Sequence, residues 1–223
     1  MTDEETGFGF QRLSQDEGDV AVFTVNGRTK LNLIGRETIT RCAAGIRQHA
    51  NDPQIRCAIL QGRSDDAFIG GADLQELQLF ETHNAAEFVG SIHSLCSAIR
   101  EFPVPVIARI RGACLGGGLE IAVACDFRIA DGSAIFGMPE VRVGVPSVVE
   151  AALLPQLIGW GKTRELIYRG NIIDASEAAQ IGLIEQYVGE ADIDDTLAAV
   201  ITDILAAAPN AIQLQKKLCR QWE

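Results

Sequence analysis

The sequence is poor in the features that mark several large classes of protein. No apolar run in its 223 residues approaches the roughly 20 that a membrane-spanning helix requires. Basic residues are also scarce, since 19 lysines and arginines stand against 30 aspartates and glutamates, for a formal net charge of −11. Because phosphate backbones and anionic lipid surfaces attract positive charge, we expect neither nucleic acid nor a membrane as a partner.

Cysteine spacing typical of zinc or redox sites is also missing. The six cysteines lie apart, each among apolar neighbours: Cys42, Cys57, Cys96, Cys114, Cys125 and Cys219. We expect them to be small buried residues in a reducing compartment. Cys114 lies in a glycine-rich stretch but has no histidine nearby in sequence, so a nucleophilic role is the minor alternative there. The first residues, 1–6, are acidic and unlike a secretory or mitochondrial signal, and we expect a cytoplasmic protein.

Several chemical motifs do not occur. The glycines from Gly112 onward follow the pattern Gly-x-x-x-Gly-Gly-Gly, which is not the dinucleotide fingerprint. Gly161-Lys162-Thr163 resembles the end of a phosphate loop, but Gln156 stands where that loop requires glycine. Gly-x-Ser-x-Gly is absent, and the three histidines lack carboxylates at metal-ligand spacing: His49, His83 and His93. We therefore expect no nucleotide loop, serine hydrolase or metal site.

Apolar periodicity predicts strands that alternate with helices. The expected strands cover 8–14, 20–25, 57–60, 106–110, 127–130, 134–137 and 184–188. The expected helices cover 36–49, 73–80, 85–99, 119–125, 148–157, 162–169, 175–181, 193–207 and 210–222. The first two strands would form a hairpin, and Ser147 is the expected N-cap of the helix over 148–157. This order indicates an α/β fold with parallel layers.

Two glycine-rich stretches lead into expected helices, Gly70-Gly71-Ala72 and Gly116-Gly117-Gly118. The first N–H groups of a helix have no acceptor within it and lie at the positive end of its dipole. Two such donors from separate loops could hold one carbonyl oxygen, which is the arrangement of an oxyanion hole. The pattern therefore predicts a site that stabilises an enolate or a tetrahedral anion.

Two carboxylates lie in unusually apolar surroundings. Glu120 stands within Leu-Glu-Ile-Ala-Val-Ala, and Glu140 follows Phe-Gly-Met-Pro. Two carboxyl groups that face one small space do not both ionise readily, so a general acid and a general base could coexist near neutral pH. The structural alternative is a helix N-terminal charge for Glu120 and a capping or ion-pair role for Glu140.

Four segments together resemble the crotonase (enoyl-CoA hydratase/isomerase) superfamily in order and spacing. They are residues 67–74 (Ala-Phe-Ile-Gly-Gly-Ala-Asp-Leu), 112–120, 125–126 (Cys-Asp) and 136–140 (Phe-Gly-Met-Pro-Glu). The resemblance extends over about residues 8–222 and implies a crotonase-like spiral of ββα units over 1–190. Residues 191–223 would be the start of a C-terminal helical region, truncated because the family carries further helices. A homotrimer or a dimer of trimers is also implied.

The same resemblance implies an acyl-CoA enzyme without a metal or redox cofactor, in which coenzyme A is part of the substrate. Ala72 and Gly117 would supply the oxyanion-hole amides. Glu120 would help water attack Cβ as a base, and Glu140 would exchange the proton at Cα. Further substrate-binding positions implied by the resemblance are Lys30, Leu31, Gly71, Asp73, Leu74, Gly116, Pro139 and Ser147.

The presence of both glutamates favours a hydratase, because isomerases of the family usually keep only the acid at the position of Glu140. Double-bond isomerisation, another crotonase-type reaction, and non-catalytic acyl-CoA binding are the alternatives. The family often continues with Pro-Gly-x-Gly-Gly, whereas this chain has Pro146-Ser147-Val148-Val149-Glu150. We expect the β-branched pair and the third carboxylate to reshape the acyl pocket.

Overall fold

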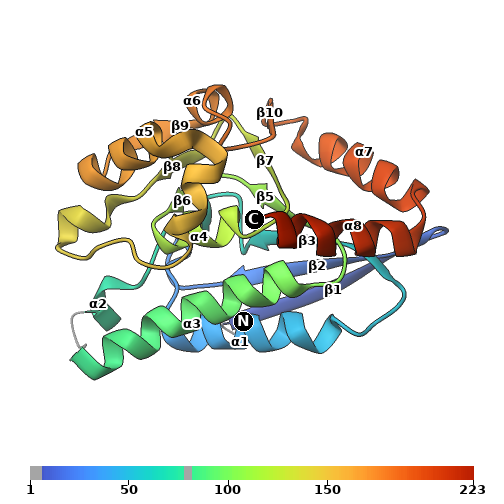
Figure 1. Ribbon diagram of the computed structural model, residues 1–223, viewed down its shortest axis with the longest axis horizontal. Helices are drawn as coiled ribbons and strands as arrows, with labels where there is room; N and C mark the ends of the chain where they lie inside the picture. Colours follow the sequence, from blue (N-terminus) through green and yellow to red (C-terminus); the bar gives the residue numbers. More distant parts are fainter. Residues whose placement is uncertain (1–6, 78–81) are drawn as a thin grey trace.

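The computed structural model describes residues 7–77 and 82–223, and the large sheet within them has the order β1-β2-β3-β5-β7-β10 (Figure 1). Its strands are β1 (Gly7–Gln15), β2 (Gly18–Asn26), β3 (Ile55–Gly62), β5 (Val106–Ile110), β7 (Phe127–Asp131) and β10 (Gln186–Val188). β1 and β2 pair antiparallel, and every pair from β2 to β10 is parallel. The predicted hairpin and the predicted parallel layer are confirmed.

A second sheet lies beside the first, with the order β4-β6-β8-β9. Its strands are β4 (Ala67–Ile69), β6 (Ala113–Leu115), β8 (Ile135–Gly137) and β9 (Ile172–Asp174). The first three each follow a strand of the large sheet after a short turn. Gly112, at φ +60°, makes the turn from β5 to β6 and passes close to the carbonyl of Asp66, so no side chain fits there. Long strand, short strand and helix thus recur along the chain, as the implied spiral of ββα units requires.

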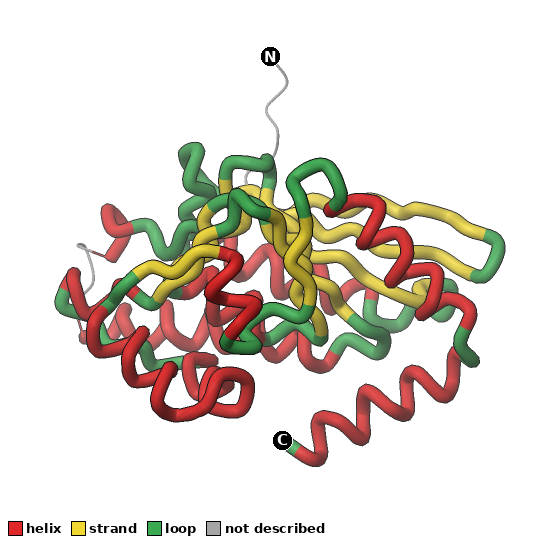
Figure 2. The backbone as a smooth tube through the Cα atoms, turned by 90° about the horizontal axis from the view of Figure 1, so that it is seen from above, coloured by secondary structure: helices red, strands yellow, loops and turns green. Residues whose placement is uncertain are grey.

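Helices cover both faces of the large sheet. α1 (Arg36–His49) and α3 (Thr82–Glu101) lie side by side on one face, and α7 (Ile193–Ala206) lies on the other (Figure 1). The strand side chains alternate accordingly, so that Val22 and Ile59 pack under α7 while Phe23 and Leu60 face the main core. Covering on both faces explains the nearly continuous apolar runs of these strands. Figure 2 shows the strands as a band across the molecule, with most of the helices along one side of it.

The remaining helices follow the two glycine-rich stretches or belong to the C-terminal half of the chain. They are α2 (Leu74–Leu77), α4 (Gly117–Val123), η1 (Pro139–Val143), η2 (Glu150–Leu153), α5 (Leu154–Arg169), α6 (Ala175–Gln180) and α8 (Pro209–Trp222). The helix predicted over 73–80 is observed as α2 as far as Leu77, and 78–81 lie outside the described residues. No single described helix has the length and apolar character of a membrane span; α7 and α8 reach them only jointly, across a bend of 106°.

The helix predicted over 148–157 is wrong in its first half. Residues 148 and 149 are non-helical, a 3₁₀ turn follows as η2, and α5 begins only at Leu154. Two consecutive β-branched valines disfavour a helix there. Ser147 is therefore not an N-cap, and its hydroxyl is hydrogen-bonded to Glu140 instead.

Five of the six cysteines are buried, as predicted, and Cys219 on α8 is exposed. Burial raises the pKa of the Cys114 thiol well above its ordinary value. A buried thiol that holds its proton is a poor nucleophile, which disfavours the alternative considered for Cys114.

Candidate active site

The two glycine-rich stretches lie against each other. A β-carbon added to Gly71 would lie 3.4 Å from the carbonyl oxygen of Leu115, and Gly118 packs directly on Ile69. Gly71 and Gly116 both have positive φ, at +116° and +54°, a region that L side chains rarely adopt. Glycine is thus required at this contact, which brings residues 69–72 alongside residues 115–118.

Each glycine-rich stretch contains one backbone N–H group that the neighbouring backbone hydrogen bonds do not use: that of Ala72 in the first stretch and that of Gly117 in the second. Ile34 donates its N–H to the carbonyl of Gly71 (3.0 Å), and Asp73 donates its N–H to the carbonyl of Ile34 (2.9 Å). Because successive N–H groups in extended backbone point to opposite sides, that of Ala72 points away from Ile34. Gly117 is the first residue of α4, so its N–H has no acceptor within the helix. Within residues 7–77 and 82–223 neither N–H is hydrogen-bonded to an acceptor, so two available donors lie on adjoining segments.

Glu120 lies in the first turn of α4 and is only 3% exposed. Its Oε1 accepts hydrogen bonds from the N–H groups of Val149 (3.2 Å) and Ala151 (3.0 Å). Among residues 7–77 and 82–223, no donor is hydrogen-bonded to its other oxygen, Oε2. Burial raises the pKa of Glu120 to about 7, the nearby charge of Glu140 adds to this rise, and the two amides oppose it. Glu120 can therefore gain or lose a proton near neutral pH.

Glu140 reaches the same place from η1, where Pro139 is the preceding residue. A β-carbon at Gly116 would lie 2.7 Å from Oε1 of Glu140, so this carboxyl group covers the glycine just before Gly117. Ser147 donates its hydroxyl to Oε2 of Glu140 (3.1 Å). Burial raises the pKa of Glu140, and the Ser147 hydroxyl opposes that shift. The structure thus brings both predicted glutamates to one glycine-rich turn.

The other predicted residues lie around the first glycine-rich stretch. Gly70 donates its N–H to the carbonyl of Leu31 (2.8 Å), and Arg28 pairs with Asp73 (3.2 Å). These contacts hold the loop over 27–33, with the exposed residues Lys30 and Leu31, beside the segment that carries Ala72. Leu74 begins α2 and is also exposed. All predicted site residues therefore fall in two adjoining groups.

Asn32 is a structural residue of this loop that pattern reasoning missed. It is fully buried at φ +53°, and its side chain accepts the N–H of Gly27 (2.6 Å) and donates to the carbonyl of Val25 (3.1 Å). It also donates to the carbonyl of Phe68. An asparagine that tolerates positive φ within a loop rich in turn residues is the only sequence signal for this role.

Two further residues beside Glu120 were not predicted as a pair. Nδ1 of His93, on α3, lies 2.8 Å from Oε1 of Glu150, the first residue of η2. The sequence shows the third carboxylate but not its partner, because 57 residues separate the two. Contacts over such a distance depend on how α3 and η2 pack, which no local pattern reports.

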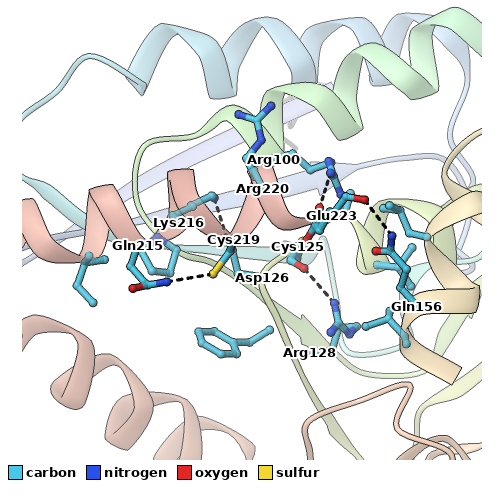
Figure 3. A pocket seen from close by; sticks show the side chains of 17 residues that line it. Arg100, Cys125, Asp126, Arg128, Gln156, Gln215, Lys216, Cys219, Arg220 and Glu223 are labelled. Carbon is cyan, nitrogen blue, oxygen red and sulfur yellow. Dashed lines mark hydrogen bonds and ion pairs between the residues drawn. The ribbon is translucent and has the colours of Figure 1, made fainter.

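The described residues contain no group of three or more histidine, cysteine or acidic side chains arranged to hold a metal ion. A cavity of about 320 Å³ lies under α8, and none of the predicted site residues lines it (Figure 3). Two ion pairs join charged side chains within this cavity, Lys216 with Asp126 (2.7 Å) and Arg100 with Glu223 (2.5 Å). Lys216 also donates to the carbonyls of Ile99 (3.3 Å) and Val104 (3.0 Å). These bonds fasten α8 to the core.

Comparison with known proteins places this chain among relatives of one family. The sequence model of a family described as "Enoyl-CoA hydratase/isomerase" matches residues 15–222. The short-chain-enoyl-CoA hydratase of Clostridium acetobutylicum is 34% identical over 92% of this chain and 79% of its own length. The crotonyl-CoA hydratase of Syntrophomonas wolfei is 32% identical over the same shares. The crystal structure of an enoyl-CoA hydratase from Bacillus anthracis superposes with a TM-score of 0.88 at 30% identity, covering 95% of this chain and 81% of that one.

Proposed function

The chain belongs to the enoyl-CoA hydratase/isomerase family, and on that premise we propose that it is a hydro-lyase that adds water reversibly across the 2,3 double bond of an enoyl-CoA. The observation that carries the proposal is the pair of carboxyl groups beside the turn at Gly116, from buried Glu120 and half-buried Glu140. Burial raises the pKa of both groups, that of Glu120 to about 7, so Glu120 can hold or release a proton near neutral pH beside a second carboxyl group.

The N–H groups of Ala72 and Gly117 would hold the thioester oxygen of the substrate. Attack on Cβ turns this carbonyl oxygen into an enolate oxygen, whose growing negative charge strengthens both hydrogen bonds. Removing one donor of such a pair typically costs about 10²–10³ in kcat. Gly117 adds the positive end of the α4 dipole at the same point.

The two carboxyl groups would divide the proton transfers. Ionised Glu120 takes a proton from water as the water oxygen bonds to Cβ, and the Cα–Cβ π electrons move toward the thioester oxygen. Protonated Glu140 then gives its proton to Cα as the enolate collapses. The carboxyl groups have now exchanged protonation states, so one proton must return from Glu120 to Glu140 before the next turnover. Because one proton serves the pair, the two groups titrate together rather than separately.

Substrate binding would use the site residues around the two glycine-rich stretches. Lys30 and Leu31 would lie along the coenzyme A part, mainly through the backbone, with Gly71, Asp73 and Leu74 beside the thioester. Gly116, Pro139 and Ser147 would border the reacting carbons. The relatives named short-chain-enoyl-CoA and crotonyl-CoA hydratase support a short acyl chain. Coenzyme A enters as part of the substrate, and the proposed reaction requires no other cofactor.

The test is to mix the protein with crotonyl-CoA and to follow the loss of the conjugated-thioester absorbance. We expect Glu120→Gln and Glu140→Gln to abolish hydration and to leave acyl-CoA binding nearly intact. Wild-type rates in either variant would refute the assigned roles, and no absorbance loss with enoyl-CoAs of several chain lengths would refute the reaction. Product analysis by NMR in deuterated water separates hydration, which leaves a 3-hydroxyacyl product, from double-bond isomerisation.

Two further properties remain predictions. We propose a homotrimer or a dimer of trimers, supported by the family resemblance, and a cytoplasmic location, supported by free buried cysteines. Light scattering on the purified protein measures the first. Fractionation of the source cells measures the second.

A further inference from the structure

Glu150 is a third carboxylate beside the proposed catalytic pair, and the proposed reaction does not use it. Its side chain is only 9% exposed, and among the described residues its Oε2 is buried without a hydrogen-bond partner. Its Oε1 lies 2.8 Å from Nδ1 of His93, whose side chain is 66% exposed. A buried carboxylate oxygen without a donor is unfavourable by itself, so an amide or apolar side chain would serve stability better at this position.

The backbone on either side of Glu150 holds Glu120. The N–H groups of Val149 and Ala151 are the two donors to Oε1 of Glu120. The segment that carries them has little regular structure of its own, because Val149 is non-helical (φ −103°, ψ −109°) and η2 is a short 3₁₀ turn. The His93–Glu150 bond is a side-chain contact that ties this segment to α3.

Helix α3 is also the wall behind the proposed oxyanion donor. Cδ1 of Ile92 would lie 3.5 Å from a β-carbon at Gly117, and Sγ of Cys96 lies 3.8 Å from the carbonyl oxygen of Glu120. The 149–151 segment, α4 and the glycine-rich turn thus share α3 as a common support. A bond from α3 to Glu150 therefore fixes the amides relative to the carboxylate that they hold.

We propose that Glu150 is a positioning residue, whose bond to His93 holds the 149–151 segment so that the N–H groups of Val149 and Ala151 point at Oε1 of Glu120. This proposal rests on the proposed function only for the use made of Glu120. His93 and Glu150 hold the 149–151 segment in place, whereas Glu120 and Glu140 carry out the proton transfers. Without the tether, the segment can move away and Glu120 loses two hydrogen bonds that favour its ionised form.

Glu150 also acts on Glu120 through its charge, and the experiment has to separate the two effects. In the described part of the chain, the titratable groups that face Glu120 are Glu140 from η1, Glu150 from η2 and Cys96 from α3. Glu150→Gln removes the charge but keeps an oxygen that accepts the proton of His93. Glu150→Leu removes both the charge and the tether. A role through charge alone gives both variants the same Glu120 titration, whereas a tether makes them differ.

The test is to titrate the Glu120 carboxyl by ¹³C NMR, with its signal assigned from its absence in Glu120→Gln. We expect the Glu120 midpoint in Glu150→Leu to lie about one pH unit above that in Glu150→Gln, since the free segment no longer stabilises the carboxylate. His93 is exposed, so it can be substituted without disturbing the core. In His93→Asn the side-chain amide can donate to Glu150 from near the place of Nδ1, whereas His93→Ala has no side-chain donor. We therefore expect His93→Ala to raise the midpoint relative to His93→Asn.

Kinetics supply a second readout in the same variants. With crotonyl-CoA, we expect kcat to fall several-fold in His93→Ala with KM unchanged, and His93→Asn to recover most of the loss. Equal midpoints within both variant pairs would overturn the proposal. If Glu150→Leu does not fold, the pair at position 93 decides alone. The NMR titration needs no turnover, so a wild-type protein without hydratase activity would refute the proposed function and leave this inference open to the same measurement.

Discussion

Gly116 offers a sharp test of the proposed site, because it combines an unusual backbone conformation with a close approach to Glu140. Its φ of +54° and ψ of −126° lie in a region that is nearly restricted to glycine. A β-carbon there would lie 2.7 Å from Oε1 of Glu140, closer than real β-carbons approach an oxygen. Gly116→Ala must therefore strain the backbone and displace the carboxyl group by several tenths of an ångström. Backbone strain of this kind costs about 1–3 kcal/mol in the free energy of unfolding.

The effect on catalysis should exceed the effect on folding. Misplacement of a reacting group by about 1 Å can cost roughly 10²-fold, so we expect kcat for crotonyl-CoA hydration to fall by about tenfold or more. Gly90→Ala is the matched control, because a β-carbon at this helical position in α3 meets no atom of the described residues within 4 Å. The control should keep wild-type kcat and gain up to about 1 kcal/mol in unfolding free energy. A folded Gly116→Ala protein with kcat within a factor of about two of wild type would refute the placement of Glu140.

Three further predictions concern individual side chains. The pKa of Glu120 rises from 4.5 to about 7 on folding, so its burial costs nothing at low pH and destabilises the protein progressively as pH rises through this window. Denaturant titrations should therefore show Glu120→Gln gaining about 3 kcal/mol relative to wild type between about pH 4 and about pH 8, and a gain independent of pH would contradict the raised value. Ser147→Ala removes the hydroxyl that donates to Glu140, and we expect a kcat lower by about tenfold with KM unchanged; a change in KM alone would place Ser147 in binding instead. Lys216→Ala removes the ammonium group that donates to Asp126 and to two backbone carbonyls, and should lower the free energy of unfolding by about 1–3 kcal/mol, because the Asp126 side chain is 29% exposed and stays hydrated; an unchanged denaturation midpoint would show that these bonds do not fasten α8.

Periodicity predicted the long elements well because each buries a full face. α1 and β5 were both predicted with their observed bounds. A long apolar stripe on a helix, or a long apolar run in a strand, is buried only when the whole element packs against the core, so the pattern marks its ends. In the second sheet only β8 was predicted, as the strand over 134–137, and β4, β6 and β9 were missed because strands of three residues carry little pattern. A strand of that length does not show an alternating pattern, and its pairing partners come from distant parts of the chain.

The candidate site was predictable only where a local rule was broken. Consecutive glycines before a helix and carboxylates in apolar runs are costly for the fold, so they stand out in a single sequence. The side-chain contacts that hold these residues in place do not stand out in the sequence. Ser147 looked like a helix cap and proved to be a partner of Glu140, and the bond between His93 and Glu150 depends on the packing of α3 against η2.

The choice of backbone amides rather than a cation for the proposed oxyanion hole follows from the neighbouring carboxyl groups. A lysine or arginine beside the thioester would stabilise the enolate, but it would also lower the pKa values of Glu120 and Glu140. A nearby cation would thus favour the ionised form of both groups, and an ionised carboxylate cannot donate a proton to Cα. The N–H groups of Ala72 and Gly117 carry only partial charge and cannot be deprotonated in this range, so they disturb the glutamates much less. Glycine at position 116, required by its positive φ and by the approach of Glu140, thus carries the backbone into a site whose proposed donors are uncharged and leave the two carboxyl groups able to exchange a proton.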